Sequence, residues 1–372
     1  MLPGNPASFW DYRVHTVSCT KDGCGPTDPE PPVDPEPPVV PPVVPPVNPP
    51  EEREQVASQV PAYLTLGLSL FNYNDQFGGL RQRLGDIRSG TASDPLGGEV
   101  FARYIGGQSR YAANRSFTNY GYDFDQQNNA FQVGASILNV VGDNSLLRAG
   151  WAFDHGTTRL TPRAVDGHSS SKLTANGFSG WLTWQHGSGW WVDGVVTGRR
   201  FVGDVGTDDL GKDMARVHAS SWVMSVETGM PFAVGGEWTV EPRFQLLRQN
   251  VSFRDFADAD GLDVKLGSGT QTSATVGALL SRFINPKLAP YVRVDLTHTV
   301  NGTSTPDLTS EAWNVSNQFA TGRTGNAVRV AAGLTSQLTP HVQLYGEGNY
   351  QHYVGSYGMR GWSGNAGIRV TF

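Results

Sequence analysis

The chain ends in GWSGNAGIRVTF at residues 361–372, a stretch in which apolar or small residues alternate with polar ones. Trp362, Ile368 and Phe372 fall in one row, and Asn365 and Arg369 fall in the other. A period of two sends successive side chains to opposite faces of a β-strand. A terminal strand is an exposed edge unless another strand pairs with it. We therefore expect this strand to close a barrel by pairing with the first strand of the sheet.

The same period recurs through the preceding sequence. In residues 147–154, Leu147, Ala149, Trp151 and Phe153 alternate with Arg148, Gly150, Ala152 and Asp154. An even number of antiparallel strands lets a membrane barrel close with both ends on one side. The predicted fold class is all-β, a 12-stranded antiparallel transmembrane β-barrel. The expected strands are residues 97–105, 128–138, 146–155, 173–185, 189–201, 215–229, 237–249, 271–283, 289–300, 326–337, 341–351 and 361–372.

The connections between these strands alternate in length, as they do in outer-membrane barrels. Short turns are expected at residues 139–144, 186–188, 233–236, 284–287 and 338–340. Long polar loops are expected at residues 106–127, 156–172, 202–214, 250–270 and 301–325. Aromatic residues near strand ends suggest interfacial girdles; they are Trp184, Trp190, Trp191, Trp238, Tyr350 and Trp362.

The composition is compatible with a barrel and excludes other classes. Mean hydropathy is −0.33, and no apolar run reaches the roughly 18 residues of a transmembrane helix. A barrel strand needs an apolar residue only at every second position. The formal charge of −6 argues against a nucleic-acid partner.

The first 50 residues contain two segments that are not part of a barrel. Residues 1–10 lack the features of a signal peptide, so we expect a fragment or a start further upstream. Residues 1–25 are interpreted as a remnant with one strand at residues 9–14; Cys19 and Cys24 form either a small disulfide loop or a pair of free thiols. Residues 26–50 hold 13 prolines and predict a polyproline II linker of roughly 75 Å, with an SH3-type ligand as the alternative.

Residues 51–90 are predicted to be helical. A continuous helix over residues 62–88 would be about 40 Å long. That length crosses a bilayer, but its second half is too charged to face lipid. We expect this α-helix to be threaded through a polar lumen; an amphipathic helix on a soluble domain is the alternative. Residues 91–372 then form the barrel domain.

Charged residues lie in the polar rows of the expected strands, where they would face a wet lumen. Motifs of hydrolases, metalloproteases and nucleotide-binding enzymes do not occur, so no enzyme, metal or cofactor is expected. An acid–base constellation is the alternative, but mixed charges that pair with each other and hold the helix explain the pattern better. The lumen charges are Arg103, Arg148, Asp193, Glu227, Glu241, Arg243, Arg293, Asp295, Arg329, Glu347 and Arg369.

Four motifs give residues 51–372 a resemblance to the translocator unit of classical monomeric autotransporters. They are GGLRQRLGDIR at 78–88, GGEVFARY at 97–104, WTVEP at 238–242 and NAGIRVTF at 365–372. The resemblance implies a pore helix that includes Leu80, Arg81, Arg83, Leu84, Asp86 and Arg88. It also implies a barrel-assembly signal at Asn365, Gly367, Val370 and Phe372. Residues 1–25 would be the end of a pertactin-like or AIDA-like passenger, with the linker as a spacer.

The resemblance implies a translocator in the Gram-negative outer membrane that exports and anchors an N-terminal passenger. Its partners would be membrane lipid and lipopolysaccharide, the barrel-assembly machinery and its own passenger, and it would be a monomer. A porin-like channel and an adhesin acting through surface loops are the alternatives. Some relatives cut the passenger off at an Asn-Asn pair in the pore helix. Gly78 and Gly79 stand at those positions here, so we expect no cleavage inside the barrel.

Overall fold

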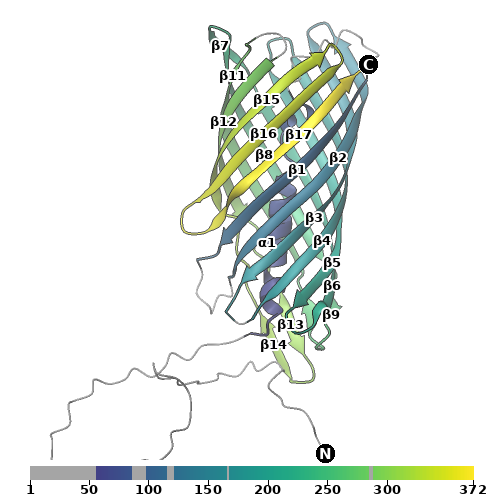
Figure 1. Cartoon of the computed structure of the whole chain (residues 1–372), viewed down its shortest axis with the longest axis vertical. Coiled ribbons are helices and arrows are strands. Elements are labelled where there is room, and N and C mark those ends of the chain that lie inside the picture. Colours follow the sequence, from purple (N-terminus) through teal and green to yellow (C-terminus); the bar gives the residue numbers. More distant parts are fainter. Residues whose placement is uncertain (1–55, 86–97, 115–120, 166, 285–287) are drawn as a thin grey trace, which may run out of the picture. The chain divides into compact units, whose positions relative to one another are not determined.

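Twelve long antiparallel strands form a closed barrel in the computed structural model (Figure 1). The structure describes residues 56–85, 98–114, 121–165, 167–284 and 288–372. The chain divides into two units, residues 1–57 and 58–372, and the barrel belongs to the second. The expected strand at 9–14, the cysteine pair, the proline-rich linker, Asp86 and Arg88 lie outside the described residues.

The barrel strands follow one another around the ring in chain order, and all twelve lie where the alternation predicts them. They are β1 (Glu99–Ala112), β2 (Asp123–Gly142), β3 (Ser145–Arg163), β4 (Ser169–His186), β5 (Trp191–Thr207), β6 (Gly211–Gly229), β8 (Trp238–Phe253), β11 (Ser268–Arg282), β12 (Leu288–Asn301), β15 (Asn326–Thr339), β16 (Val342–Val354) and β17 (Gly358–Thr371). The short β7 (Phe232–Gly235) pairs with the start of β8.

The last strand closes the ring on the first, as its pattern predicts. β1 and β17 pair continuously from Glu99↔Thr371 to Ala112↔Gly358. The backbone N–H of Phe372 donates to the Gly98 carbonyl at 3.0 Å. Every barrel strand therefore has two neighbours, which removes the exposed edge.

Several strands extend beyond their predicted ends, so three of the predicted loops are wrong. Residues 106–127, 156–172 and 202–214 are largely strand in the structure. The other two predicted loops contain a separate small sheet of β9 (Phe256–Ala257), β10 (Asp263–Lys265), β13 (Asp307–Ser310) and β14 (Val315–Gln318). We call this end of the barrel the loop end, and the end with the short hairpins and Phe372 the turn end.

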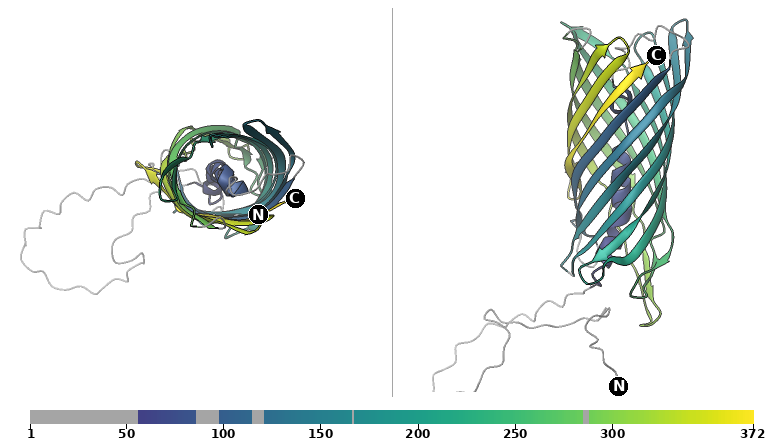
Figure 2. Two further views of the ribbon diagram at one scale, coloured as in Figure 1. Left: turned by 90° about the horizontal axis from the view of Figure 1, so that it is seen from above. Right: turned by 45° about the vertical axis from the view of Figure 1, so that its right-hand side comes forward.

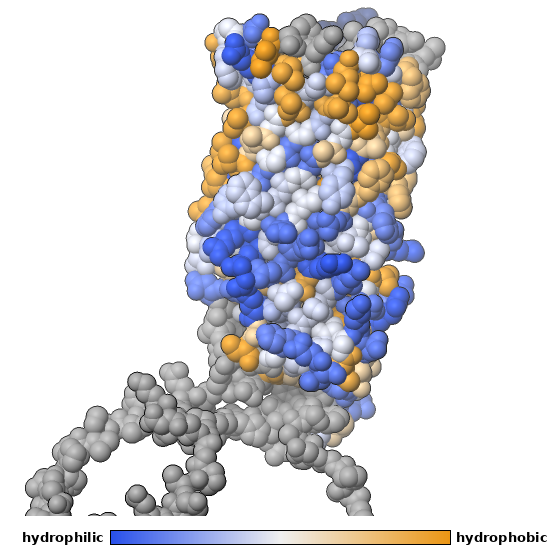
Figure 3. Space-filling model, viewed as in Figure 1, coloured by the Kyte–Doolittle hydropathy of each residue, from blue (hydrophilic) through white to orange (hydrophobic). Residues whose placement is uncertain are grey.

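These three segments look like polar loops because the wall changes character along the strands: its outward residues become polar and its inward residues become apolar toward the loop end. On β3, the outward residues change from Trp151 and Phe153 to Arg159 and Arg163, while the inward residues change from Asp154 to Leu160. The alternation of inward and outward side chains continues along β3 without interruption. Figure 3 shows the result, with an apolar outer surface toward the turn end and a polar one toward the loop end. The loop-end half thus has the apolar inside and polar outside of a water-soluble barrel.

Inward glycines give space to large rings on the neighbouring strand. A Cβ atom on each of these glycines would lie between 2.3 and 2.8 Å from the facing ring. A ring laid over a glycine of the neighbouring strand also helps to fix the register between the two strands. The pairs are Gly134 with Phe101, Gly150 with Trp181, Gly229 with Trp191, Gly333 with Tyr291 and Gly367 with Tyr345.

Trp191 is one of these inward rings, so its expected place in an interfacial girdle is wrong. It is 6% exposed, and its indole N–H donates to Glu241 Oε1 at 3.3 Å. The adjacent Trp190 faces outward and packs edge-on against Trp184 at 5.0 Å between ring centroids. Trp190 directly precedes β5, and successive residues of an extended chain point to opposite sides, so only one of the two tryptophans faces the membrane.

Two helices lie inside the barrel (Figure 2). α1 is Val60–Asp75 and α2 is Leu80–Leu84, so the continuous helix expected over residues 62–88 is wrong. Gly79 has a φ of +101°, which a right-handed helix cannot contain. No helix among the described residues is long and apolar enough to cross a bilayer.

Candidate functional site

The interior of the loop-end half is an apolar core built around α1. Leu64, Leu66, Leu68 and Leu70 are each at most 3% exposed. A helix with buried residues on every face must be enclosed on all sides, which disfavours the alternative of a helix on the surface of a soluble domain. The wall contributes residues that are at most 1% exposed, namely Tyr111, Phe124, Leu160, Leu173, Phe201, Val205, Val217 and Val251.

The first turn of α1 is held by the small sheet at the loop end. Tyr63 packs edge-on against Phe256 with ring centroids 5.4 Å apart. Asp258 accepts hydrogen bonds from Tyr63 Oη at 3.0 Å and from Gln59 Nε2 at 3.3 Å. Burial raises the pKa of the Asp258 carboxyl, while its hydrogen bonds from Leu262, Gln59 and Tyr63 oppose that shift.

The end of α1 meets the first buried ion pair of the wall. Arg199 binds Asp154 through two hydrogen bonds of 2.8 and 3.2 Å, and both side chains are almost fully buried. The same guanidinium donates to Asn74 Oδ1 at 2.8 Å and stacks on the Phe77 ring, 3.8 Å from its centroid. Removing one partner of such a pair costs about 3–5 kcal/mol, because the remaining charge stays buried. Arg199 therefore connects the wall to the chain as it leaves α1.

The break at Gly78 and Gly79 directs the next backbone N–H to the wall. Leu80 N–H donates to Glu227 Oε2 at 2.9 Å, in place of a carbonyl one turn earlier. The break therefore exchanges one helical hydrogen bond for a charge-assisted bond to the barrel, which is the stronger kind.

Besides the bond from Leu80 to Glu227 of β6, α2 makes polar contacts with three further strands, β5, β8 and β16. Arg83 Nη2 donates to Asp193 Oδ1 at 2.7 Å, and Gln82 Nε2 donates to Glu347 Oε1 at 2.7 Å. Tyr345 Oη donates to the Arg83 carbonyl at 2.6 Å, and Arg81 lies 3.6 Å from Glu241. Hydrogen bonds to charged groups are worth about 1.5–3 kcal/mol each. Leu80 and Leu84 fill the remaining space against Phe101, Ala152, Trp181 and Trp191.

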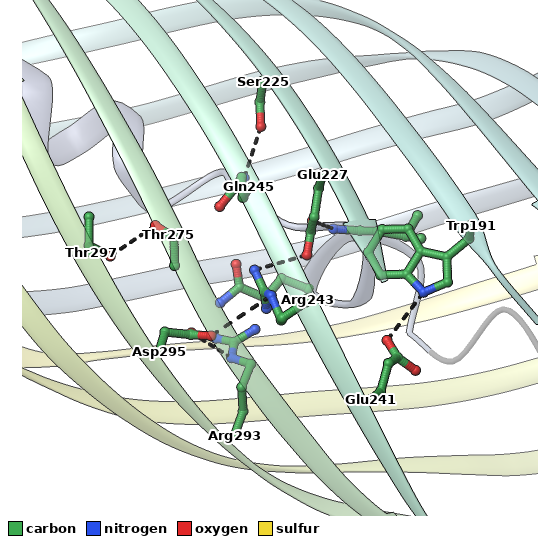
Figure 4. A network of polar contacts seen from close by, with 12 residues as sticks. Trp191, Ser225, Glu227, Glu241, Arg243, Gln245, Thr275, Arg293, Asp295 and Thr297 are labelled. Carbon is green, nitrogen blue, oxygen red and sulfur yellow. Dashed lines mark hydrogen bonds and ion pairs between the residues drawn. The ribbon is translucent and has the colours of Figure 1, made fainter. Parts of the chain in front are cut away.

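Two of the wall carboxylates that hold α2, Glu227 and Glu347, are also paired with wall arginines; Figure 4 shows the pair of Glu227 and Arg243. Arg243 lies 2.9 Å from Glu227 and 3.8 Å from Asp295. Arg293 lies 3.0 Å from Asp295 and 2.7 Å from Glu347. Each of these carboxylates is engaged by a guanidinium, so the cluster holds the chain of α2 in place. Among the described residues, no group of His, Cys, Asp or Glu has the arrangement of a metal site.

The predicted lumen charges all lie on the inward face. Arg103 donates to Gln132 Oε1 and to the Phe77 carbonyl, at 2.8 and 3.2 Å. Arg148 and Arg369 each lie 3.8 Å from Glu99. Arg329 Nη2 donates to Gln351 Oε1 at 2.6 Å. The remaining members belong to the contacts described above.

The four residues of the predicted assembly signal lie in or beside β17. Gly367 is covered by the Tyr345 ring, and Asn365 pairs with Ile105 of β1. Val370 lines an outer apolar groove with Val100 and Ile368. Phe372 is 70% exposed, and its ring packs over Gly98.

Some residues that hold the helices were not singled out as site residues from the sequence. Asn74 and Gln82 have no pattern that distinguishes them from other polar residues of a helix. Tyr345 and Gly156 had a usable signal, because both occupy inward positions by strand parity. A Cβ atom at Gly156 would lie 2.3 Å from Tyr73 Oη, so this glycine makes room for α1.

Known proteins resemble this chain in both sequence and architecture. The Autotransporter beta-domain family profile matches residues 100–349. The chain is 23% identical over 318 residues to the Autotransporter CRAC of Citrobacter rodentium, covering 82% of this chain and 18% of that protein. It is 24% identical over 334 residues to the Adhesin BmaC autotransporter of Brucella suis, covering 84% and 10%. The chain thus spans less than a fifth of the length of these relatives. The transport unit of the autotransporter AIDA-I from Escherichia coli superposes with a TM-score of 0.65 at 16% identity, covering 86% of this chain and all of that one.

Proposed function

Because the chain belongs to the autotransporter β-domain family, we propose that the filled lumen is the former exit route of an N-terminal passenger. The barrel is an outer-membrane translocator domain of a Gram-negative cell, with the apolar turn-end half of its outer surface in the membrane. The short hairpins then face the periplasm, and the loop end faces the outside.

The direction of the chain through the barrel carries this proposal. β1 begins at the turn end, where Glu99 pairs with Thr371. α2 lies among the turn-end wall residues, and Gln59 at the start of α1 contacts the loop end. Residues 59–84 therefore span the lumen from the loop end to the turn-end wall, with Gln59 at the outer end. A passenger attached to this segment would be anchored at the cell surface.

The filled lumen favours a translocator over the porin alternative. Both helices are packed and hydrogen-bonded inside the ring, as Figure 2 shows from above. We propose that they enter last and act as a plug once export is complete. Purified full-length chain should conduct poorly in planar bilayers, and deletion of residues 51–88 should open it. Unchanged conductance after that deletion would contradict the plug.

We extend the proposal to the parts of the chain that the structure does not describe. Residues 1–25 would be the end of the passenger, 26–50 a spacer, 51–90 the pore segment and 91–372 the barrel. The lumen charges would hold the plug, and Asn365, Gly367, Val370 and Phe372 would be read by the barrel-assembly machinery. The barrel would function as a monomer with no catalytic role.

We also propose that the passenger is not released by chemistry in the pore. Asn74 is held by Arg199 and by Ser221 Oγ at 3.3 Å, and Asn72 donates to Ser109 and Gln126. A carboxamide held in this way is not free to attack its own backbone. An N-terminus within residues 72–80, found by mass spectrometry of protein from outer membranes, would contradict this proposal.

An epitope placed before residue 26 of the full chain, behind a signal peptide, tests the export function. Protease added to intact cells should remove this epitope. A second epitope in the hairpin between β2 and β3 should stay protected until the outer membrane is permeabilised, because that hairpin lies at the turn end. An N-terminal epitope that stays protected while the barrel is correctly folded would refute the export function.

A further inference from the structure

The outer surface of β17, β1, β2 and β3 carries a polar groove just beyond the apolar band. The groove has a volume of about 540 Å³ and includes Arg110, Asp125, Arg159 and Arg360 in its lining. Tyr350 and Trp362 form one of its walls, with ring centroids 4.6 Å apart. The outward residues on the turn-end side of it are apolar, including Tyr104, Phe131 and Phe153.

The positive charge of the groove exceeds the negative charge beside it. Asp125 is shared by Arg110 at 2.8 Å and Arg163 at 2.7 Å. The side chains of Arg159 and Arg360 make no ion pair or hydrogen bond with the part of the chain that the structure describes. Two nearby carboxylates are already engaged, because Asp123 accepts from the Ala113 N–H and Asp204 lies 3.6 Å from Arg216.

Like charges also face each other directly across this part of the sheet. Arg110 pairs in register with Arg360, and Arg159 pairs with Lys172. Directly opposed like charges destabilise neighbouring strands. Arg110 is compensated by Asp125, and Lys172 pairs in register with Asp204 on its other side. The positive charge left over lies on Arg159 and Arg360, which an external anion could neutralise.

We propose that this groove binds the phosphorylated sugar headgroup of a glycolipid in the outer leaflet. Guanidinium groups bind phosphate through paired, charge-assisted hydrogen bonds. Tyrosine and tryptophan lie preferentially at the headgroup level of membranes, and the rings of Tyr350 and Trp362 offer flat faces to a sugar. The acyl chains would follow the apolar residues toward the turn end. The proposal rests on the barrel lying in an outer membrane, and it is independent of whether the passenger is exported.

The choice of a lipid over a free anion follows from the position of the groove. Its apolar margin is continuous with the membrane-facing band, which a soluble phosphate would not use. Figure 3 shows the apolar band giving way to a hydrophilic surface toward the loop end. This arrangement matches an amphiphile whose charged head and apolar tail are joined at the membrane surface.

The test is a titration of the folded full-length chain in neutral detergent with lipopolysaccharide that lacks O-antigen. The variant R159Q/R360Q should weaken binding at least about tenfold, because each arginine contributes a charge-assisted contact. The control R200Q/R248Q removes two outward arginines of β5 and β8 that face no like charge, and it should change binding less than about twofold. Dephosphorylated lipopolysaccharide should bind the unaltered chain as weakly as the intact lipid binds R159Q/R360Q.

A second readout compares the thermal stability of the protein without lipid and with lipid. Without lipid, R360Q should unfold at the same temperature as the unaltered chain or higher, because it removes the repulsion with Arg110. With lipopolysaccharide, it should gain less stability than the unaltered chain gains. Equal loss of binding in the control variant, equal binding of the dephosphorylated lipid, or displacement of the lipid by millimolar inorganic phosphate would each overturn the proposal. Surface exposure of the N-terminal epitope should be the same in all variants.

Discussion

Leu66 and Leu70 of α1 should determine how firmly the plug closes the outer half of the barrel. Both side chains are 0% exposed and lie one turn apart on the same helix face. Truncation of a buried leucine to alanine costs about 2–5 kcal/mol, depending on how far the cavity collapses. For neighbours that share a cavity the two losses need not add, so we take about 4 kcal/mol for L66A/L70A.

That loss can be converted to a measurable change in gating. The barrel wall keeps its own hydrogen bonds when α1 leaves. The two substitutions therefore destabilise the closed state and leave the open state unchanged. At 1.4 kcal/mol for each factor of ten, the ratio of open to closed channels should rise about a thousandfold. Single-channel recordings of the purified full-length chain in planar bilayers measure this ratio directly.

The matched control makes the same substitution on the outer face. Leu182 and Leu280 face outward and are 49% and 41% exposed, so L182A/L280A removes the same atoms without touching the plug. Its open probability should equal that of the unaltered chain. A ratio for L66A/L70A within about threefold of the unaltered chain, or an equal increase in the control, would refute an apolar seal around α1.

Three further predictions concern the wall glycine Gly156, the contact between Arg83 and Asp193, and the closure of the barrel at Phe372. G156L should raise the open probability, because its side chain would occupy the position of Tyr73 Oη. The control G180L has no atom within 4 Å of its Cβ position and should leave gating unchanged. Equal gating in both variants would count against the packing of Tyr73 over Gly156. R83M and D193N should each lower the temperature at which the plug is released, with a coupling energy of about 1–3 kcal/mol in the double-mutant cycle; simple additivity would show that the 2.7 Å contact contributes nothing. F372S should reduce the heat-modifiable, folded fraction on gels, because it loses the packing over Gly98, while F232S on the short strand β7 should not; normal assembly of F372S would weaken the terminal-signal assignment.

The strand count and the barrel class could be predicted because they depend on local parity. Every barrel strand has a period of two, whichever partner it meets, so rows such as Leu147, Ala149, Trp151 and Phe153 reveal a face without any knowledge of the fold. The same parity placed the lumen charges on one face. The last predicted strand has the same period of two, and an edge strand of a sheet is exposed until another strand pairs with it; here β1 is that partner.

The strand lengths could not be read in the same way. Arg159 and Arg163 look like loop residues, because polar outward residues are expected only beyond the membrane. They lie in a strand because Leu160 beside them packs into the core around α1. Whether an inward residue is buried depends on α1, which precedes β3 by many residues in the chain. The polarity of the outward residues therefore indicates where the membrane ends, and it does not indicate where the strand ends.

By itself, then, the sequence determined the closed barrel of twelve strands, the inward and outward rows and the presence of a helical segment before β1. Only the tertiary structure decided which charge meets which, where the helix breaks and which of two adjacent tryptophans faces the lumen. Arg83 meets Asp193, and Leu80 meets Glu227, because the shear of the barrel brings distant strands to the same height. Shear is a property of the closed ring, set by all its strand registers together. No single segment of the sequence contains that information.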